Sequence, residues 1–450
     1  MNLAQSLLAA TERHPELEAL PGVRYDAFLD TVRRVAGGLG LRRGDRLAVV
    51  LDNRADTVLL LWAAWWSGAI AVPLSWRVSD EELAYCRTDC GASVAVTERD
   101  PLPDGAPHPG DLDLPASEIA LVLYTSGTTG RPKGVPRSHA ADRAGAWSQA
   151  LQHGYRWRER TLGVMPLYHT MGIHSLLAMH LVGGCYVTQP RWDAAEALAL
   201  IERERVTSLY LAPTLFHDLV HYPQLATADV SSVRALGYAG AAMQSTLVGR
   251  CAEVFEPDVF VNHYGSTELY TYAIGRDQRG KPGCAGRPAV NTRLKILESG
   301  EICAHLSSEE AFAGYWNRPD ADARAIRDGW YHTGDTGHLD DEGDLWIDGR
   351  IDDMIVSGGE NIHPLEVEDV LAGCPGVSEV AVIGVPDDRL GQRVVAVVVG
   401  DATAEMMDAH CLSSPLARFK RPREYRSAPE LPKSASGKIL RRALRDEGKR

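Results

Sequence analysis

Short apolar runs alternate with amphipathic helical segments through the first two-thirds of the chain, and this alternation constrains the fold more than any other feature. Strands are predicted at residues 47–51, 69–74, 93–97, 121–124, 161–165, 185–188, 208–211 and 235–238. Residues 194–205 have the spacing of an amphipathic helix. Such alternation is typical of a layered α/β domain with largely parallel sheets. The chain has 450 residues, which is enough for more than one core.

The pattern changes after about residue 290. Strands predicted at 293–297, 300–304 and 344–348 are separated by turns, which indicates a β-rich subdomain attached to the large domain. A charge-dense link at 348–353 then leads to a predicted helix at 364–372 and strands at 377–384 and 393–399. The sequence therefore predicts a large domain over residues 1–351 and a small α+β domain over residues 352–450.

Charge disfavours general nucleic-acid binding, because the chain carries a net charge of −13. Residues 413–450 depart from this balance, with twelve Lys and Arg against four Asp and Glu, a net +8. A solvated basic tail is the simplest interpretation of this stretch. Contact with the phosphate groups of a small anionic substrate is the functional one.

Nothing in the sequence predicts a membrane span. Residues 58–74 are apolar, but Ser67, Gly68 and Pro73 interrupt them, so a buried helix followed by a strand is expected. The first residues lack the basic region of a signal peptide. Eight cysteines are scattered without CxxC or Cys/His metal spacing. We therefore expect reduced thiols in the cytoplasm, with neither a disulfide framework nor a zinc site.

One glycine-rich segment follows a predicted strand and is suited to bind phosphate. It reads Tyr124-Thr-Ser-Gly-Thr-Thr-Gly-Arg-Pro-Lys-Gly134. Backbone N–H groups, hydroxyls and Lys133 can together surround phosphate oxygens. The segment is not the common P-loop, because Lys133 follows a proline and precedes a glycine. A flexible Ser/Thr/Gly turn is the alternative for this segment alone.

Four further motifs make the functional interpretation specific. They are Tyr264-Gly-Ser-Thr-Glu268, Tyr331-His-Thr-Gly-Asp335, Gly349-Arg-Ile-Asp-Asp353 with Ser357-Gly-Gly-Glu-Asn-Ile362, and Pro432-Lys-Ser-Ala-Ser-Gly-Lys438. In this order and spacing, with the glycine-rich segment, they resemble the adenylate-forming superfamily of acyl- and aryl-CoA ligases, peptide-synthetase adenylation domains and luciferases. The resemblance covers nearly the whole chain.

The resemblance implies a two-step reaction. A carboxylate attacks the α-phosphate of ATP and pyrophosphate leaves, which produces an acyl-AMP. A thiol, that of CoA, then displaces AMP. Because the first step brings two anions together, it requires Mg²⁺, cationic side chains and aimed hydrogen-bond donors.

By resemblance, most of the nucleotide-binding residues lie in two motifs. The phosphate loop comprises Thr125, Ser126, Gly127, Thr128, Thr129, Gly130 and Lys133. The second motif comprises Tyr264 for adenine, Gly265, Ser266, Thr267 for the α-phosphate, and Glu268 for Mg²⁺. Asp335 matches the acid that accepts both ribose hydroxyls, and Arg350 supports it.

The resemblance gives the C-terminal residues two successive roles. Lys438 corresponds to the catalytic lysine that reaches the carboxylate and the α-phosphate. The small domain then rotates about Asp352, which makes it mobile. Gly358 and Gly359 correspond to glycines along the pantetheine channel. Arg421 is a candidate for CoA phosphate, and Arg87 is a weaker one.

The acid itself is less constrained. His169, in Met165-Pro-Leu-Tyr-His169, matches the residue that gates the acyl pocket. The predicted pocket comprises His169, Thr170, Met171, Ala239, Gly240, Leu269 and Tyr270. Local segments look most like 4-chlorobenzoate:CoA ligases and related aryl-CoA ligases, although Leu390 stands where those enzymes place a tryptophan on the CoA adenine. The pocket candidates include no Lys or Arg and the chain is short, which favours a small aromatic or cyclic acid over dicarboxylates or long fatty acids.

Several alternatives remain at this level. The acyl group could be loaded onto a carrier-protein phosphopantetheine instead of CoA. A luciferase-like oxygenase uses the same adenylate. A non-catalytic AMP or acyl-adenylate sensor is disfavoured because Lys438 and Glu268 are both present. A nucleic-acid binder that uses the basic tail is disfavoured because the rest of the chain carries −21.

Overall fold

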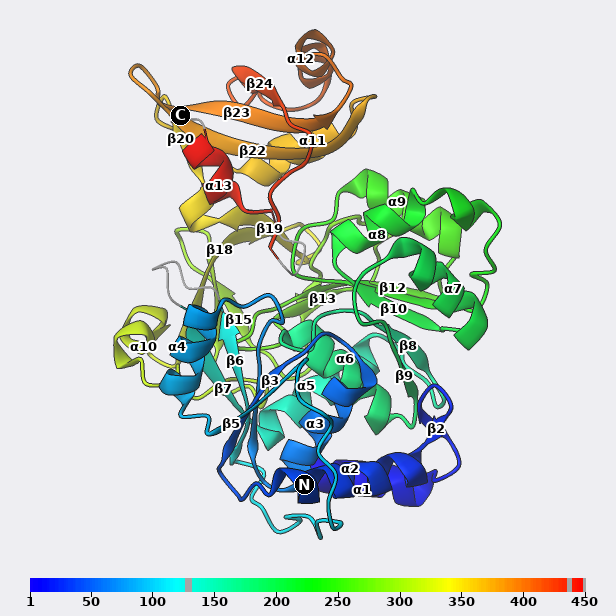
Figure 1. Ribbon diagram of the computed structural model, residues 1–450. Coiled ribbons are helices and arrows are strands. Elements are labelled where there is room, and N and C mark those ends of the chain that lie inside the picture. Colours follow the sequence, from blue (N-terminus) through cyan, green and yellow to red (C-terminus); the bar gives the residue numbers. More distant parts are fainter. Residues whose placement is uncertain (126–131, 435–438, 448–450) are drawn as a thin grey trace.

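The computed structural model describes residues 1–125, 132–434 and 439–447, and the side chains of the last range to residue 445. Four larger sheets and their helices form the molecule, with the C-terminal sheet set apart at the top of the view (Figure 1). The fold is mixed α/β, as the alternation predicted. No helix in the described ranges is long and apolar enough to cross a membrane.

The first sheet has the order β5-β3-β4-β6-β7. Its strands are β3 (Arg46–Val50), β4 (Ile70–Pro73), β5 (Val94–Thr97), β6 (Ile119–Thr125) and β7 (Lys133–Ser138). All pairs are parallel except β6 with β7. The associated helices are α1 (Leu3–Arg13), α2 (Tyr25–Leu39), α3 (Ala55–Trp66) and α4 (Asp80–Cys90), and a short hairpin joins β1 (Glu18–Leu20) to β2 (Val23–Arg24).

The apolar stretch at 58–74 forms a buried helix and strand, as predicted. Helix α3 is apolar around its whole circumference, which is typical of a helix covered on every side. The indole of Trp65 donates to the carbonyl of Ala120 at 3.0 Å, which ties the helix to β6. Burial of this stretch inside protein accounts for its hydropathy.

The second sheet has the order β14-β13-β12-β11-β10-β8-β9. Its strands are β8 (Arg160–Gly163), β9 (Cys185–Thr188), β10 (Ser208–Leu211), β11 (Ala235–Tyr238), β12 (Val259–Tyr264), β13 (Ala273–Gly275) and β14 (Arg287–Pro288). The strands from β9 to β12 are parallel, and β13 and β14 are antiparallel additions. The helices of this unit are α5 (His139–Gln152), α6 (Thr170–Leu181), α7 (Ala194–Glu204), α8 (Pro213–Val220), η1 (Pro223–Ala226) and α9 (Ser245–Phe255).

A β-rich unit follows, as the change of pattern indicated. It contains β15 (Leu294–Ile296), β16 (Glu301–His305), α10 (Pro319–Ala325), β17 (Ile326–Arg327), β18 (Trp330–Leu339) and β19 (Leu345–Arg350). The ten-residue strand β18 was not predicted. Its sequence is rich in Gly, Thr, His and Asp and only partly buried, so it lacks the apolar run that identifies a strand.

The last sheet is built entirely from residues after 354. Its strands are β20 (Ile355–Ser357), β21 (Glu360–Ile362), β22 (Val377–Asp387), β23 (Gly391–Gly400) and β24 (Glu424–Ser427), with helices α11 (Pro364–Ala372), α12 (Ala404–Ser413) and α13 (Arg441–Glu447). The 3-10 turn η2 (Ile351–Asp353) connects β19 to this sheet. The predicted boundary at Asp352 falls within that connection.

Candidate active site

The described nucleotide-motif residues converge on the carboxyl end of β12. Tyr264 ends that strand, and Glu268 lies in the loop after it. Asp335 comes from β18, Arg350 from β19 and Lys133 from β7. Six of the predicted site residues lie outside the described part of the chain: Ser126, Gly127, Thr128, Thr129, Gly130 and Lys438. Thr125 is paired with Lys133 at the end of the β6–β7 hairpin, so the predicted phosphate loop connects two antiparallel strands.

Asp335 is held by two donors from different elements. Its Oδ1 accepts a hydrogen bond from Arg350 at 2.9 Å, and its Oδ2 accepts one from the Tyr264 hydroxyl at 2.6 Å. Asp335 and Arg350 are cross-strand partners in the β18–β19 ladder, so the register brings them together. Burial and the neighbouring Asp335 charge raise the pKa of Tyr264, which keeps the phenol protonated as a donor. Each carboxylate oxygen keeps capacity for another donor, such as a ribose hydroxyl.

Glu268 forms a second fixed carboxylate. It is 8% exposed, and its Oε1 accepts a hydrogen bond from the Tyr315 hydroxyl at 2.7 Å. The ammonium of Lys133 lies 4.3 Å from the centre of the Tyr315 ring. Burial lowers the pKa of Lys133, and the Glu268 charge opposes that shift. Tyr315 therefore links the metal-binding candidate to the lysine of the phosphate loop.

Tyr315 is not among the site residues predicted from the sequence. It precedes Trp316 in a loop that carries no recognised motif, and its contact with Glu268 spans 47 positions. No local spacing could reveal this pair.

The loop between Tyr264 and Glu268 is fixed by its own backbone and by a buried arginine. A Cβ on Gly265 would lie 1.7 Å from the carbonyl oxygen of Tyr270, so only glycine fits there. The Ser266 hydroxyl contacts the Tyr272 hydroxyl at 2.7 Å and accepts from the Glu268 N–H at 3.2 Å. Arg137, which was also not predicted as a site residue, donates to the Thr267 carbonyl at 2.9 Å.

His169 and its neighbours open helix α6. His169 is the N-cap residue, and Thr170 is the first residue of the helix. Burial lowers the pKa of His169 to about 4, so the imidazole is neutral at neutral pH. A Cβ on Gly240 would lie 3.6 Å from the sulfur of Met171, so these two pocket candidates are adjacent. Met171 and Ala239 belong to one apolar cluster.

Tyr270 lies in a buried polar network that the sequence did not indicate. Its hydroxyl donates to Gln149 at 2.6 Å and lies 3.2 Å from the Tyr210 hydroxyl. Its ring stacks on His174, with centroids 3.6 Å apart and planes 12° from parallel. The His174 ring in turn lies 3.4 Å from the buried carboxylate of Asp142. Tyr270 therefore offers a fixed aromatic ring, and its hydroxyl is already engaged.

Leu269 is placed differently from the other pocket candidates. It is fully buried in a separate cluster with Val135, Phe312 and Tyr315. Leu269 and Tyr270 pack against different surroundings, because Leu269 joins the cluster of Val135 and Phe312 whereas Tyr270 stacks on His174. In the described structure Leu269 packs behind the Glu268 loop and is not grouped with Met171 and Ala239.

The predicted thiol-channel residues lie in the C-terminal unit. Gly358 and Gly359 form the turn of the β20–β21 hairpin, with φ of 62° and 88°. A two-residue turn of this kind requires positive φ at both positions, which explains the glycines independently of any channel. The Gly358 N–H donates to the carbonyl of Leu390 at 2.8 Å. Arg421 forms an ion pair with Asp408, and Asp352 is exposed in η2.

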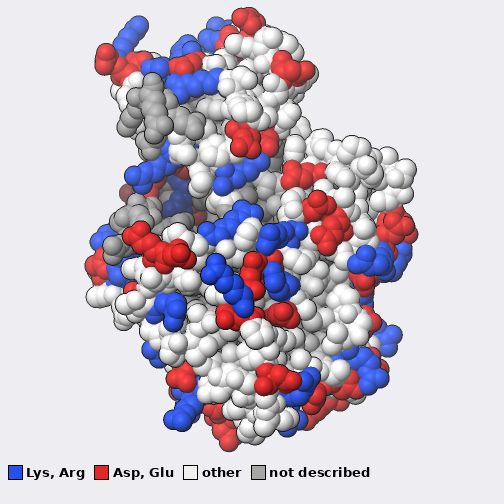
Figure 2. Space-filling model, in the orientation of Figure 1, with Lys and Arg blue, Asp and Glu red and all other residues white. Residues whose placement is uncertain are grey.

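Basic side chains accompany a hollow on the face that Figure 2 shows. The hollow separates the C-terminal part from the rest of the molecule, and Lys and Arg lie along it. Strands β18 and β19 rise toward this region from below (Figure 1). A polyanionic substrate matches this charge.

Comparisons with known proteins agree with this geometry. A family model described as AMP-binding enzyme matches residues 8–115 and 98–316, and a model of the AMP-binding enzyme C-terminal domain matches residues 366–438. A long-chain-fatty-acid–CoA ligase of Mycobacterium tuberculosis is 33% identical over 466 positions, covering 94% of this chain and 92% of the relative. A 4-chlorobenzoate–CoA ligase of an Arthrobacter species is 33% identical over 465 positions, covering 93% and 88%.

Solved structures show the same architecture. The crystal structure of an anthranilate CoA ligase in complex with anthranoyl-AMP has a TM-score of 0.89 and 26% identity, covering 99% of this chain and 97% of that one. The chain belongs to the family of AMP-binding enzymes.

Proposed function

We propose that the protein is an ATP-dependent acid–thiol ligase that converts a small aromatic or cyclic carboxylic acid to its CoA thioester through an acyl-AMP. The arrangement of Asp335, Arg350 and Tyr264 beside the Glu268–Tyr315–Lys133 group carries this proposal. The first group presents ordered acceptors suited to a ribose diol. The second group offers a carboxylate and an ammonium, which suit Mg²⁺ and the phosphates of ATP respectively.

In the first half-reaction these residues bind and orient ATP. Asp335 accepts the ribose hydroxyls, and the hydrogen bond from Arg350 fixes the orientation of that carboxylate. Lys133 and the loop from Thr125 to Gly130 hold the phosphates that leave as pyrophosphate. Lys438 supplies a positive charge to the acid's carboxylate and the α-phosphate. Lowering the repulsion between these two anions is the main catalytic task.

Glu268 is the residue proposed to hold Mg²⁺. A carboxylate is the hard oxygen ligand that this ion prefers, and the Tyr315 hydrogen bond fixes its orientation while leaving further acceptor capacity. The ion, when bound, would neutralise charge on the phosphate oxygens. Thr267 lies next to Glu268, and Arg137 donates a hydrogen bond to the Thr267 carbonyl. This hydrogen bond fixes the backbone from which both side chains extend.

In the second half-reaction the C-terminal unit presents a different face. We propose that residues 352–450 rotate as a body about Asp352, which exchanges Lys438 for the hairpin at Gly358 and Gly359. Because glycines lack a Cβ, pantetheine can pass close to this backbone. For Arg421 to contact CoA phosphate, its ion pair with Asp408 must open or be shared.

The preference for an aromatic or cyclic acid rests on the residues around α6. We propose that the rigid, buried stack of the Tyr270 and His174 rings backs the acyl pocket, and the hydroxyl of Tyr270 is already hydrogen-bonded. His169 is neutral and partly buried, which suits a gate against an uncharged ring. The similarity to ligases of 4-chlorobenzoate and anthranilate supports this class, whereas the fatty-acid relative supports a longer acid.

A carrier-protein phosphopantetheine is the second candidate acceptor. The charge of the C-terminal segment is compatible with either thiol, because both present phosphate groups. We place the reaction in the cytoplasm, where ATP and CoA are available. The eight cysteines are free and buried, which suits a reducing compartment.

The experiment that tests the proposal follows AMP release with ATP and CoA across benzoates, cyclic acids, dicarboxylates and fatty acids. A clear preference for aromatic or cyclic acids is expected. Adenylate formation without thioester would move the acceptor to a carrier protein. No turnover with any acid would overturn the proposal in favour of a non-catalytic nucleotide-binding role.

Lys438→Ala separates the two half-reactions. Adenylation should fall by roughly 10²–10³-fold, by analogy with the loss of a transition-state donor. Thioester formation from a supplied acyl-AMP should persist. If both half-reactions survived unchanged, the assigned role of Lys438 would be wrong.

A further inference from the structure

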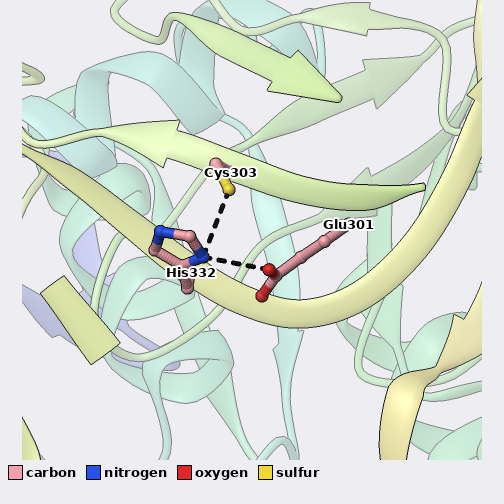
Figure 3. A group of neighbouring side chains, drawn as sticks. All are labelled: Glu301, Cys303 and His332. Atoms are coloured by element: carbon pink, nitrogen blue, oxygen red, sulfur yellow. Dashed lines mark hydrogen bonds and ion pairs between the residues drawn. The ribbon is translucent and has the colours of Figure 1, made fainter. Parts of the chain in front are cut away.

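Three side chains with metal-binding atoms meet between β16 and β18, apart from the Glu268 group. Figure 3 shows Glu301 and Cys303 on one strand and His332 on the next. The Cys303 sulfur lies 3.6 Å from Nδ1 of His332, and Oε2 of Glu301 lies 2.9 Å from the same nitrogen. One ligand atom from each residue lies within 4.8 Å of the other two.

The strand register accounts for this grouping. Cys303 and His332 are direct cross-strand partners in the antiparallel ladder. Glu301 precedes Cys303 by two positions, so both side chains leave β16 on the same side. Cys303 is fully buried, and the side chains of His332 and Glu301 are only 12% and 15% exposed. The cluster is thus preorganised by the sheet and reachable from one side.

One imidazole nitrogen cannot serve both neighbours by hydrogen bonding alone. Nδ1 of a neutral histidine either carries a proton or accepts one. If it donates to Glu301, it has no lone pair for the Cys303 thiol. If it accepts from the thiol, it has no proton for Glu301. A cation placed among the three atoms would satisfy them all.

We propose that Glu301, Cys303 and His332 form a binding site for a thiophilic divalent cation of the zinc class. Zinc prefers a tetrahedron of thiolate, imidazole and carboxylate ligands, with Zn–S about 2.3 Å and Zn–N about 2.0 Å. Those lengths give an S···N edge of roughly 3.5 Å, and the observed separation is 3.6 Å. The Glu301 oxygen, now 2.9 Å from that nitrogen, must move outward to reach an O···N edge of roughly 3.3 Å, and water can complete the fourth position.

Charge also favours zinc at this position. A thiolate and a carboxylate neutralise a divalent cation, so no net charge is left in a largely buried site. The thiol proton passes to solvent when the metal binds. Lys295 lies opposite Cys303 on β15, but its ammonium is held 4.3 Å from the centre of the Trp330 ring. The soft sulfur ligand distinguishes this site from one for Mg²⁺, which prefers oxygen alone.

The site lies outside the proposed catalytic machinery, yet it is close to it in the strand. His332 precedes Asp335 by three positions on β18. Between them, the Thr333 hydroxyl donates to the Ile302 carbonyl at 2.7 Å and joins the same two strands. A bound metal would add a further side-chain link between β16 and β18, beside the Thr333 hydrogen bond and the backbone ladder.

Cobalt provides a direct test, because a thiolate ligand gives Co²⁺ a near-ultraviolet charge-transfer band. The full-length protein, stripped with a chelator and free of nucleotide, is titrated with Co²⁺ and then with Zn²⁺. We expect one equivalent of Co²⁺ to produce the band and Zn²⁺ to displace it. The melting temperature should rise with Zn²⁺ and reach a plateau.

Matched variants assign the signal to the cluster. Cys303→Ser should abolish the band and the zinc-dependent rise in melting temperature. Glu301→Gln should raise the Co²⁺ and Zn²⁺ concentrations needed for half of each effect by at least several-fold. Cys251→Ser is the control, because Cys251 is equally buried on α9 and belongs to no such cluster among the described residues. Absence of the band in the parent protein, or its survival in folded Cys303→Ser, would overturn the proposal.

Discussion

At the scale of single residues, the site depends on side chains that orient other side chains. Tyr315 has this role for Glu268, and Tyr264 has it for Asp335. Both phenols are protonated donors, because burial and the adjacent carboxylates raise their pKa values. A Tyr→Phe substitution deletes either hydroxyl and keeps the ring. The effect of orienting the carboxylate can therefore be measured separately from the packing of the ring.

Tyr315→Phe should weaken the use of Mg²⁺. The substitution deletes the hydroxyl that donates to Glu268 at 2.7 Å and keeps the ring that lies under Lys133. A hydrogen bond to a charged group contributes about 1.5–3 kcal/mol, so adenylation at limiting Mg²⁺ should fall roughly ten-fold or more. Part of the loss should be recovered at saturating Mg²⁺.

Tyr331→Phe is the control for this substitution. Its hydroxyl lies 3.4 Å from that of Tyr315, and within the described residues it makes no hydrogen bond with Glu268 itself. Rates are measured as pyrophosphate release at several Mg²⁺ concentrations. Equal effects of the two variants would show that Tyr315 acts through packing and not through the carboxylate.

A contact within the site could be expected from the sequence only where both of its residues belong to recognised motifs. Asp335, Arg350, Tyr264 and Glu268 come from recognised motifs, and the structure brings them together around one strand end. Tyr315 is joined to its partner only by the fold. The cluster of Glu301, Cys303 and His332 was also missed, and no zinc site was expected, because its ligands come from neighbouring strands and not from a CxxC-like spacing.

At the scale of elements, buried strands and helices followed the apolar pattern closely. Predicted strands at 185–188, 208–211 and 235–238 and the helix at 364–372 have the observed bounds. Apolar runs of this length leave little choice of structure when they are buried on both sides. Strand β18 was not predicted, because its sequence is mostly polar and only partly buried. It therefore lacks the run of apolar residues by which a core strand is identified.

Gly145 lets helix α5 pack closely against the stacked rings of His174 and Tyr270. A Cβ there would lie 2.7 Å from Nε2 of His174 and 3.1 Å from Cδ1 of Tyr270. Helix propensity favours alanine over glycine by about 1 kcal/mol, but overpacking costs about 1–3 kcal/mol. Gly145→Ala should therefore displace the stacked pair and raise KM for the acid by about ten-fold, with KM for ATP nearly unchanged.

Gly249→Ala is the matched control on helix α9. No atom lies within 4 Å of a Cβ at that position, so the helix should gain up to about 1 kcal/mol of stability without a kinetic effect. KM values for acid and ATP and the melting temperature are measured for both variants. An unchanged acid KM in Gly145→Ala would separate Tyr270 from the acyl pocket.

At the scale of the whole molecule, buried histidines should make the protein sensitive to mild acid. Burial lowers the pKa of His139 and His180 to about 4 and that of His263 to about 3. In the unfolded chain these groups titrate near 6.5. The unfolded state therefore binds more protons below 6.5, and the free energy of unfolding falls as pH falls from 6.5 toward 4.

The loss should be about 1.4 kcal/mol per pH unit for each such histidine. Carboxylates with lowered pKa values contribute their losses at lower pH, so the interval from 6.5 to 5 reports the histidines. Urea unfolding is measured at several pH values in that interval. His180→Gln, whose amide can still donate to the Ala19 carbonyl, should reduce the slope by one histidine. A stability that is flat across the interval would contradict the prediction.

The relation between the C-terminal sheet and the rest of the chain is a second property of the whole molecule. In this structure the Asp369 carboxylate of α11 accepts from the backbone N–H of Ser245, at the start of α9, at 3.2 Å. Within the C-terminal unit, Asp353 beside the proposed hinge accepts from Arg445 of α13 at 3.0 Å. Ion pairs such as this one stabilise the C-terminal unit internally, whereas the Ser245–Asp369 pair contributes two hydrogen bonds between that unit and the large one, the second from the Ser245 hydroxyl at 3.3 Å.

Asp352→Pro should restrict rotation at that point, because proline fixes φ near −65° and limits the preceding residue. Adenylation should be retained, while transfer to CoA should fall by at least ten-fold, since only the second half-reaction requires the other orientation. The two steps are measured separately, as pyrophosphate release and as thioester formation from supplied acyl-AMP. Asp352→Ala is the control, because it removes the carboxylate and leaves the backbone free. Equal loss of both half-reactions in Asp352→Pro, with a normal melting temperature, would place the hinge elsewhere in the connection between β19 and β20.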